Sequence, residues 1–572
     1  PRPVVKITYL SSSSTILIMI IKHWKLLLLL IAALPAPGIA QDERELPPVT
    51  RTYAITHTTV VQAPGRKIEG ATVILKDGII TQVGKDIPVP ADAKVIKGDS
   101  LFVYAGFIDG LSHTGVIKPK EENNRERPKD PGNPGYEKAG ITPQQDVRNL
   151  LNPADKSIEE WRALGFTVAQ VVPHGVFLPG NAAIIQLGGG APDQSVLVSN
   201  SALYSELVPT SNVYPSTLIG VLSKWRELYK QATLSHNYEQ VYASNRSGLE
   251  RPVTDRVLQA FYPVIDKKQP VLFRADQPLD IYRVFNLQSE LQFPVIAGDL
   301  KDGSLALQRI KASGIKIFLS LDLPEAPKDE GKKDDKNTPD AEKQQLEKRK
   351  KEALDRRVGQ AAAFVNAGIS FGFSGLSAKP KDVMANLRRM IAAGLSTDQA
   401  LAALTTVPAQ LLGLSDRMGT VEPGKMANLV VTAKPLFDEK SKVRYVWVDG
   451  TMFQYQATEV KKKDDGTKAD IQGVWSFSID TPQGKTENKV TFKKDGDSYT
   501  GNVVGGMITE PVDLTDIDLD GNALKFNFKI TIDGNTVNVS IDGKVDGTSF
   551  NGTTSAGSFG SFATTASKDP KF

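Results

Sequence analysis

The sequence predicts an α/β protein built around a (β/α)8 barrel, with all-β regions before and after the barrel in the chain. Between residues 104 and 412, apolar strand-like segments alternate with amphipathic helical segments, as in a parallel sheet buried on both faces. Residues 51–103 and 471–572 instead alternate apolar and polar side chains, with Asp-Gly turns between the runs. A chain of 572 residues also exceeds one compact core, so several domains are expected.

Residues 1–40 are expected to be upstream residues followed by a secretory signal peptide. Lys22 and Lys25 precede an apolar run at 26–34, and small residues that end at Ala40 offer a cleavage site. The run is too short for a lasting membrane span. We therefore expect a periplasmic or secreted protein that is cleaved near Ala40 and has no membrane span after the signal is removed.

The composition excludes several classes of function. The net charge is only +4, and lysines and acids are mixed along the chain, so there is no basic stripe to follow a nucleic acid. The count of cysteines is 0, which excludes disulfide staples, thiol catalysis and zinc sites built on cysteine.

Residues 41–103 form the first predicted β-region, in which Asp77-Gly78 between two apolar runs indicates a hairpin. The barrel is then expected over residues 104–412. About 300 residues of alternating elements suit eight strand-helix units better than a short doubly wound sheet. The apolar strand candidates in this segment are 167–172, 182–187, 270–275, 293–298, 315–321 and 369–374.

Beyond the barrel segment the chain returns to β-structure. Residues 413–457 have the pattern of strands, residues 458–470 form a charged linker, and residues 471–572 form a separate antiparallel domain of about eight strands. In this last region Leu524 and Phe526 belong to a run that strictly alternates with polar residues. The pattern indicates a small barrel or sandwich, for which we predict no chemistry.

Four stretches resemble the amidohydrolase superfamily, in particular its imidazolonepropionase-like, cyclic-amide branch. They are "VILKDGIITQVGKDIPVP", "AGFIDGLSH", "AAGLSTDQALAALTTVPAQLLGLSDRMGTVEPGKMANLVV" and "VRYVWVDG", and the resemblance covers roughly residues 50–455. It implies a barrel flanked by a small β-sandwich that both ends of the barrel segment build. It also implies hydrolysis of carbon-nitrogen bonds with one or two divalent metals, which histidines, a carboxylated lysine and an aspartate hold at the strand ends.

The positions that match the family's metal ligands mostly carry other residue types. Where the family has two histidines on the first strand, this chain has Leu111 and His113. The later positions are Gln186 in place of a bridging lysine, Arg274 in place of a histidine, Gly298 with Asp299 beside it, and Ser374 in place of the catalytic aspartate. Only His113 therefore matches a ligand position, and no metal ligand is assigned outright.

The small number of histidines limits any metal site further. The chain has 5, of which His113, His174 and His236 fall in the barrel region. His174 follows a strand and is expected at the barrel mouth, so the candidate catalytic residues are His113, His174 and Asp109. The substrate pocket predicted at the strand ends is lined by His113, His174, Gln186, Arg274, Asp299 and Ser374.

Two hypotheses for the barrel mouth remain open. In the favoured one no cofactor is bound, and Arg274 replaces the charge of the metal by neutralising Asp109 or Asp299, or by binding an anionic ligand. In the alternative, His113, His174 and one of these aspartates hold one divalent metal such as zinc.

The two hypotheses imply different functions. Without a metal, the chain is predicted to be an exported pseudoenzyme or ligand-binding subunit, whose partner is a small-molecule ligand or a related intact amidohydrolase subunit. With a metal, it is predicted to be an active hydrolase of carbon-nitrogen bonds other than peptide bonds, such as those of cyclic amides.

Overall fold

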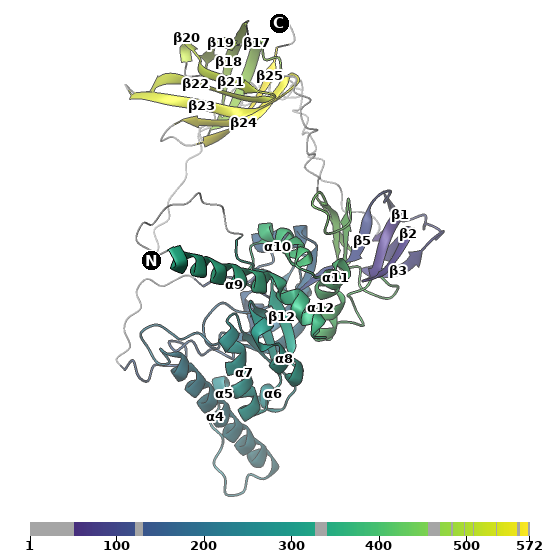
Figure 1. Ribbon diagram of the computed structural model, residues 1–572, viewed down its shortest axis with the longest axis vertical. Coiled ribbons are helices and arrows are strands. Elements are labelled where there is room, and N and C mark those ends of the chain that lie inside the picture. Colours follow the sequence, from purple (N-terminus) through teal and green to yellow (C-terminus); the bar gives the residue numbers. More distant parts are fainter. Residues whose placement is uncertain are drawn as a thin grey trace, which may run out of the picture. The chain divides into compact units, whose positions relative to one another are not determined.

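The computed structural model describes residues 51–119, 130–325, 340–455, 469–481, 484–496, 498–506, 508–532, 535–556 and 561–569. The chain divides into two compact units, Pro1–Tyr455 and Gln456–Phe572 (Figure 1). The expected signal peptide at residues 1–40, and all but the end of the expected linker at residues 458–470, lie outside the described residues. Among the helices of the described segments, none has the length and apolar content needed to cross a membrane.

Strands from both ends of the barrel segment form one eight-stranded sheet, in the order β16-β15-β14-β5-β1-β2-β3, with β4 pairing with β1. The central β14–β5 pair joins Val430 to Tyr104, so the predicted association of the two chain ends is confirmed. Asp77 and Gly78, both with positive φ, make the predicted hairpin turn between β2 and β3. The strands are β1 (Thr52–Ala63), β2 (Arg66–Lys76), β3 (Ile79–Gly84), β4 (Lys94–Lys97), β5 (Phe102–Ala105), β14 (Leu429–Thr432), β15 (Val443–Val448) and β16 (Thr451–Gln454).

The second eight-stranded sheet is the barrel, in the order β13-β12-β11-β10-β9-β8-β7-β6. Its first and last strands lie against each other. Across this seam the Ser374 hydroxyl donates to the Leu111 carbonyl over 3.0 Å, and the Gly375 amide donates to Asp109 Oδ1 over 2.8 Å. The strands are β6 (Phe107–Ser112), β7 (Phe166–Val171), β8 (Gly180–Gln186), β9 (Val196–Glu206), β10 (Val271–Arg274), β11 (Val295–Leu300), β12 (Lys316–Ser320) and β13 (Gly372–Ser374).

One barrel strand, β8, departs from the parallel arrangement that the sequence predicts. It pairs antiparallel with both β7 and β9, whereas the other neighbouring strands are parallel. Residues 172–179 are too few for the helical crossover that a parallel β7–β8 pair needs, which takes a dozen residues or more. Strand β9 is not among the strands that the sequence predicts, because polar residues interrupt its apolar run.

Helices cover the outside of the barrel (Figure 1). Helix α11 begins at a capping box, in which the Ser396 hydroxyl accepts from the Gln399 amide and the Gln399 side chain accepts from the Ser396 amide. The helices are η1 (Val147–Leu150), α2 (Lys156–Ala163), α3 (Pro192–Ser195), α4 (Leu218–Ser244), α5 (Arg256–Gln259), α6 (Tyr262–Ile265), α7 (Pro278–Leu291), η2 (Gly303–Ala306), α8 (Leu307–Ser313), α9 (Asp340–Asn366), α10 (Pro380–Ala392), α11 (Thr397–Leu404) and α12 (Thr406–Leu411).

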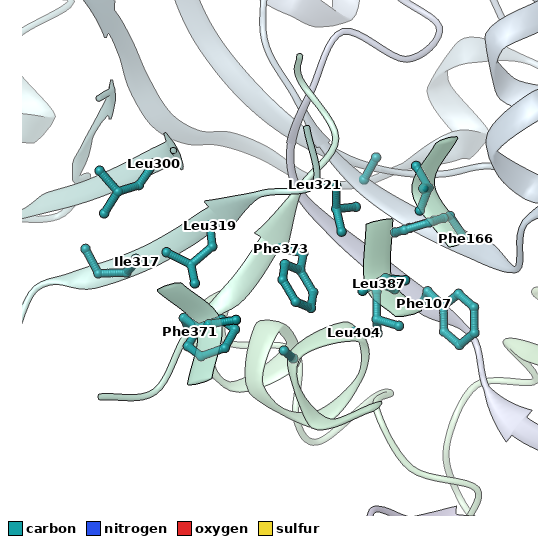
Figure 2. Packing of buried hydrophobic residues seen from close by; sticks show 14 of the residues in the cluster. Phe107, Phe166, Leu300, Ile317, Leu319, Leu321, Phe371, Phe373, Leu387 and Leu404 are labelled. Carbon is teal, nitrogen blue, oxygen red and sulfur yellow. The ribbon is translucent and has the colours of Figure 1, made fainter. Parts of the chain in front are cut away.

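The largest apolar core lies between the barrel strands and these helices. Figure 2 shows Phe373 of β13 among Leu319 of β12, Leu387 of α10 and Leu404 of α11, all of them buried in one cluster. The ring of Phe371 packs edge-on against that of Phe373, with centroids 5.6 Å apart. Burial of such side chains stabilises the barrel by roughly 1.5–3 kcal/mol each, and it fixes where the strand ends lie.

The C-terminal unit is a nine-stranded antiparallel sheet in the order β20-β19-β18-β17-β25-β24-β23-β22-β21, one strand more than predicted. The predicted alternation is confirmed, because Leu524 and Phe526 are buried while Lys525 is exposed. The strands are β17 (Gly473–Thr481), β18 (Gly484–Asp495), β19 (Ser498–Gly505), β20 (Ile508–Asp513), β21 (Thr515–Asp520), β22 (Ala523–Ile532), β23 (Asn535–Asp546), β24 (Ser549–Ala556) and β25 (Ser561–Lys568).

Candidate functional site

The carboxyl ends of the parallel strands bring charged and polar side chains to one end of the barrel. Arg274, the last residue of β10, lies in register with Glu206, the last residue of β9. On its other side Arg274 is in register with Gly298 of β11, and Asp299 follows directly. Ser374 ends β13. Such strand ends are where barrel proteins assemble their sites.

Arg274 is the centre of an ion-pair network at this end of the barrel. Its Nη1 donates to Glu206 Oε2 over 3.2 Å, and its Nη2 donates to Asp276 Oδ2 and to the Ser377 hydroxyl, each over 3.4 Å. Its Nε lies 3.6 Å from Asp299 Oδ2. Three carboxylates therefore surround one guanidinium whose side chain is 28% exposed. This geometry favours charge neutralisation over the binding of an anionic ligand.

Asp299 is held in a strained backbone conformation. Its φ is 55°, in the left-handed region, and the pairing of β11 with β12 shifts register between Ala297 and Leu300. The buried carboxylate accepts hydrogen bonds from the Ser377 hydroxyl over 2.5 Å and from the Ser374 hydroxyl over 3.4 Å. Such a backbone conformation costs of order 1–3 kcal/mol and persists only where its surroundings hold it in place. Here the hydrogen bonds to the Asp299 carboxylate hold it.

Two opposing effects act on the pKa of Asp299. Burial raises the pKa of this carboxyl above its ordinary value, because a charge is poorly solvated there. Hydrogen bonds from Ser377 and Ser320, and the nearby cations of Lys301 and Arg274, oppose the rise without cancelling it. The negative form of Asp299 therefore depends on these neighbours.

Asp109 is a second buried carboxyl at the same end of the barrel. Its Oδ1 accepts from the amides of Gly375 and Leu111, over 2.8 Å and 3.1 Å, whereas its Oδ2 has no hydrogen-bond partner. Burial raises its pKa to about 7 and Asp299 adds to the rise, against the hydrogen bonds from Gly375, Leu111 and Ser112. The ion pairs of Arg274 in the described residues do not include Asp109, so of the two aspartates only Asp299 is paired with it.

The structure brings His113 and His174 together. Their rings stack with centroids 3.9 Å apart and an angle of 22° between planes. His113 Nδ1 lies 3.0 Å from the Val172 carbonyl oxygen, and His174 Nε2 lies 3.3 Å from that of Val116, so each of these nitrogens carries the proton and donates. Burial lowers the pKa of both imidazoles, that of His113 to about 4, where the neighbouring charges of His174 and Arg274 add to the effect. Both rings are therefore neutral near pH 7.

The histidine pair does not fit the divalent metal that the amidohydrolase fold usually carries. A ring nitrogen binds metal through a lone pair that lies in the ring plane, at about 2.0–2.1 Å. Because the rings of His113 and His174 are nearly parallel and stacked, their lone pairs do not converge on one ion. The described part of the chain also contains no cluster of three or more histidine, aspartate or glutamate side chains that could hold one.

The surroundings leave little room for a metal as well. Leu111, at a ligand position of the family, is fully buried in the apolar interior of the barrel. A Cβ added at Gly298 would lie 2.6 Å from the Leu111 side chain. A Cβ at Gly375 would lie 2.4 Å from both Asp109 Oδ2 and the Trp161 ring, so packed atoms crowd the unpartnered oxygen.

Gln186 is separated from the other predicted pocket residues. Because β8 runs antiparallel, Gln186 pairs with Val168 near the start of β7. Its neighbour in sequence, Ile185, pairs with Val196, the first residue of β9. Gln186 therefore lies toward the opposite end of the barrel from Glu206, and the expectation that it lines the mouth is wrong.

Sequence reasoning missed four residues of the network: Glu206, Asp276, Ser377 and Tyr204. The Tyr204 hydroxyl donates to Glu206 Oε1 over 2.6 Å inside the barrel. Both residues lie on the unrecognised strand β9. Asp276 lies two residues after Arg274, and Ser377 lies three residues after Ser374. Polar residues just past a predicted strand end were therefore the available sign of these two site residues.

Comparisons with known proteins agree with this fold. Residues 258–453 match the amidohydrolase family. The structure is similar to an amidohydrolase from Thermotoga maritima MSB8, with a TM-score of 0.56 and 21% identity, over 70% of this chain and 100% of that one.

Two further similar structures are prolidases. One is a complex with N-methylphosphonate-L-proline (TM-score 0.41, 16% identity, 71% of this chain and 100% of that chain). The other is a putative prolidase from Bifidobacterium longum (TM-score 0.40, 16% identity, 71% and 95%). No match was found among curated proteins.

Proposed function

We propose that this chain belongs to the amidohydrolase superfamily and is a metal-free, non-catalytic member in which the Arg274 network occupies the place of the metal centre. The observation that carries the proposal is the guanidinium of Arg274 at the barrel mouth, within 3.2–3.6 Å of the carboxylates of Glu206, Asp276 and Asp299.

The charge of Arg274 explains how the mouth is held together without a metal. A guanidinium stays protonated at any ordinary pH and bridges several carboxylates through its fixed set of donors. It therefore supplies the positive charge that a divalent ion would otherwise supply to Asp299. A metal ion beside Arg274 would be repelled by this permanent cation.

The serines and histidines at the mouth also do not form a nucleophile–base pair with each other. A serine nucleophile needs a base within hydrogen-bond reach. In the described residues both His113 and His174 direct one nitrogen to a backbone carbonyl, and the hydroxyls of Ser374 and Ser377 contact Asp299. No serine–histidine pair is present among these four side chains, so neither imidazole is placed to activate Ser374 or Ser377.

In place of catalysis, the proposal assigns a binding or scaffolding role. The partner is a small-molecule ligand or a related intact amidohydrolase subunit. The signal peptide expected at residues 1–40 supports a proposal that this role is carried out in the periplasm or outside the cell. Sequencing the amino terminus of the exported protein tests that part, and a mature chain that begins close to residue 41 is expected.

One observation favours a second candidate, an active amidohydrolase with one weakly held divalent metal such as zinc. His113 and His174 lie side by side at the strand ends, and rotation of one ring would free a nitrogen lone pair. This candidate requires the hydrogen bond to Val172 or Val116 to break on metal binding.

Metal content separates the two candidates. Elemental mass spectrometry is applied to mature protein purified without chelator or affinity tag, before and after incubation with excess zinc. The metal-free proposal predicts well under one metal per chain and no change of the unfolding midpoint when a chelator is added. About one metal per chain, lost together with stability on chelation, would establish the second candidate instead.

A further inference from the structure

A cavity whose lining includes none of the residues at the barrel mouth offers a binding site of its own. Its volume is about 610 Å³, within the range of small-molecule sites. It lies between the flanking sheet and the outer barrel helices, because its walls come from β1, β2, β5, α10, α11 and the segment after β14. The lining residues are Val61, Gly65, Arg66, Lys67, Tyr104, Arg388, Ile391, Thr397, Asp398, Leu401, Pro435, Leu436, Phe437 and Asp438.

The cavity combines an apolar wall with charged groups that the protein leaves unpaired. Leu401 and Leu436 are buried apolar side chains of the wall. Arg388 on α10 and Asp398 on α11 make no ion pair and no side-chain hydrogen bond within the segments that the structure describes. The two opposite charges thus line one cavity without neutralising each other.

The other cations of the lining are already engaged. Arg66 pairs with Glu422, and Lys67 pairs with Glu69 at 2.9 Å. Arg388 is therefore the cation of the lining that a ligand can use without breaking an ion pair. It is also partly buried, and burial strengthens a charge-assisted hydrogen bond relative to one in open solvent.

Tyr104 supplies a further donor to the cavity. This residue is 5% exposed, and its hydroxyl oxygen accepts from the Leu436 amide over 3.1 Å. The hydroxyl proton has no acceptor among the described residues. A buried hydroxyl of this kind gains from an acceptor that a ligand brings.

We propose that this cavity binds a small zwitterion with an apolar body, of the amino-acid or dipeptide class. The ligand carboxylate accepts from Arg388 and the Tyr104 hydroxyl, its ammonium group pairs with Asp398, and its side chains lie on the apolar wall of Leu401 and Leu436. The site is independent of the barrel mouth, so the metal measurement above does not decide it.

Calorimetric titration of the full chain with L-leucyl-L-leucine tests this site. Arg388→Gln is expected to weaken binding roughly tenfold or more, the effect of losing one charge-assisted hydrogen bond. Asp398→Asn is expected to weaken it by up to about fivefold, because the Asp398 side chain is exposed and solvent screens its pairing with the ligand. The matched controls are Arg389→Gln, next to Arg388 but bonded to Asn386 and outside the lining, and Asp382→Asn in the first turn of α10. Both controls are expected to bind like the unaltered chain.

Blocked forms of the dipeptide identify which end meets which charge. The carboxyl amide of the dipeptide is expected to bind equally to the unaltered chain and to Arg388→Gln. The N-acetyl form is expected to bind equally to the unaltered chain and to Asp398→Asn. Absence of leucyl-leucine binding up to about 10 mM, the weak end of specific small-ligand affinity, overturns the proposal. Unchanged binding in Arg388→Gln, or an equal loss in the Arg389→Gln control, overturns it as well.

Discussion

Replacing Arg274 with methionine removes the guanidinium while keeping much of the apolar stem, and it tests whether this cation holds the barrel mouth together. In the native chain Arg274 faces Glu206, Asp276 and the fully buried Asp299. The variant leaves the Asp299 carboxylate buried without its cation. We expect a clear loss of stability of the barrel unit with the fold retained.

The magnitude follows from burial. Removing one partner of a buried ion pair typically costs about 3–5 kcal/mol. Arg274 is 28% exposed, so solvent screens part of the interaction, and Asp299 can escape part of the cost by taking up a proton. We therefore expect a loss of about 2–3 kcal/mol in the free energy of unfolding near pH 7.

The loss of stability caused by Arg274→Met is expected to depend on pH. Without Arg274 the pKa of Asp299, already raised by burial, rises further. The carboxyl is then protonated in the folded state and ionised in the unfolded state over a wider pH range. Stability falls as pH rises through that range, so the penalty of Arg274→Met is expected to be smaller at pH 5 than at pH 8.

Urea unfolding followed by tryptophan fluorescence measures this penalty. The control is Arg226→Met, because Arg226 pairs with Glu290 at 2.6 Å on the surface, where the two side chains are 34% and 40% exposed. Such a surface pair contributes about 0–1 kcal/mol. The reasoning is refuted if Arg274→Met costs no more than the control, or if its penalty is the same at pH 5 and pH 8.

Three further predictions concern single residues. Burial raises the pKa of Asp109 from 3.8 to about 7, so the ionised carboxyl destabilises the fold as pH rises through this window. In urea unfolding, Asp109→Asn should therefore gain stability relative to the unaltered chain by a few kcal/mol between pH 4 and pH 8. A difference in stability that stays constant over this pH range would contradict the prediction. His113 should stay neutral down to about pH 4 in an NMR titration of the folded protein, because burial lowers its pKa from 6.5; a midpoint near 6.5 would show that the ring is solvated. Gly110→Ala should destabilise the barrel by more than about 2 kcal/mol in urea unfolding, because the added Cβ would lie 1.9 Å from the Phe318 ring. The control Gly359→Ala, in a helix with open space around the added Cβ, should be neutral or stabilising by up to about 1 kcal/mol.

The arrangement of the mouth has a general physical reason. A barrel whose strand ends carry several carboxylates needs positive charge there, and a metal ion or a guanidinium meets the same electrostatic need. The two solutions differ in chemistry, because a metal can activate water whereas the guanidinium of Arg274 stays protonated. Under the proposed function, the Arg274 network preserves the fold of the mouth without hydrolysis.

The sequence by itself determined what depends on local pattern and residue type. Apolar runs indicated most of the barrel strands, and Asp77-Gly78 indicated the hairpin between β2 and β3. The residue types at Leu111 and Arg274 led to the prediction that metal ligands implied by the resemblance to the amidohydrolase superfamily are replaced. These features need only neighbouring residues, or a comparison of residue types at matching positions.

The tertiary structure alone decided which side chains meet. Glu206 and Arg274 are 68 positions apart, and Asp299 and Ser377 are 78 apart, yet each pair forms a contact at the barrel mouth. The direction of β8, which removes Gln186 from the mouth, follows from the short chain connections on either side of it. Local propensity does not encode such contacts, because they arise only when the closed barrel fixes strand order, direction and register together.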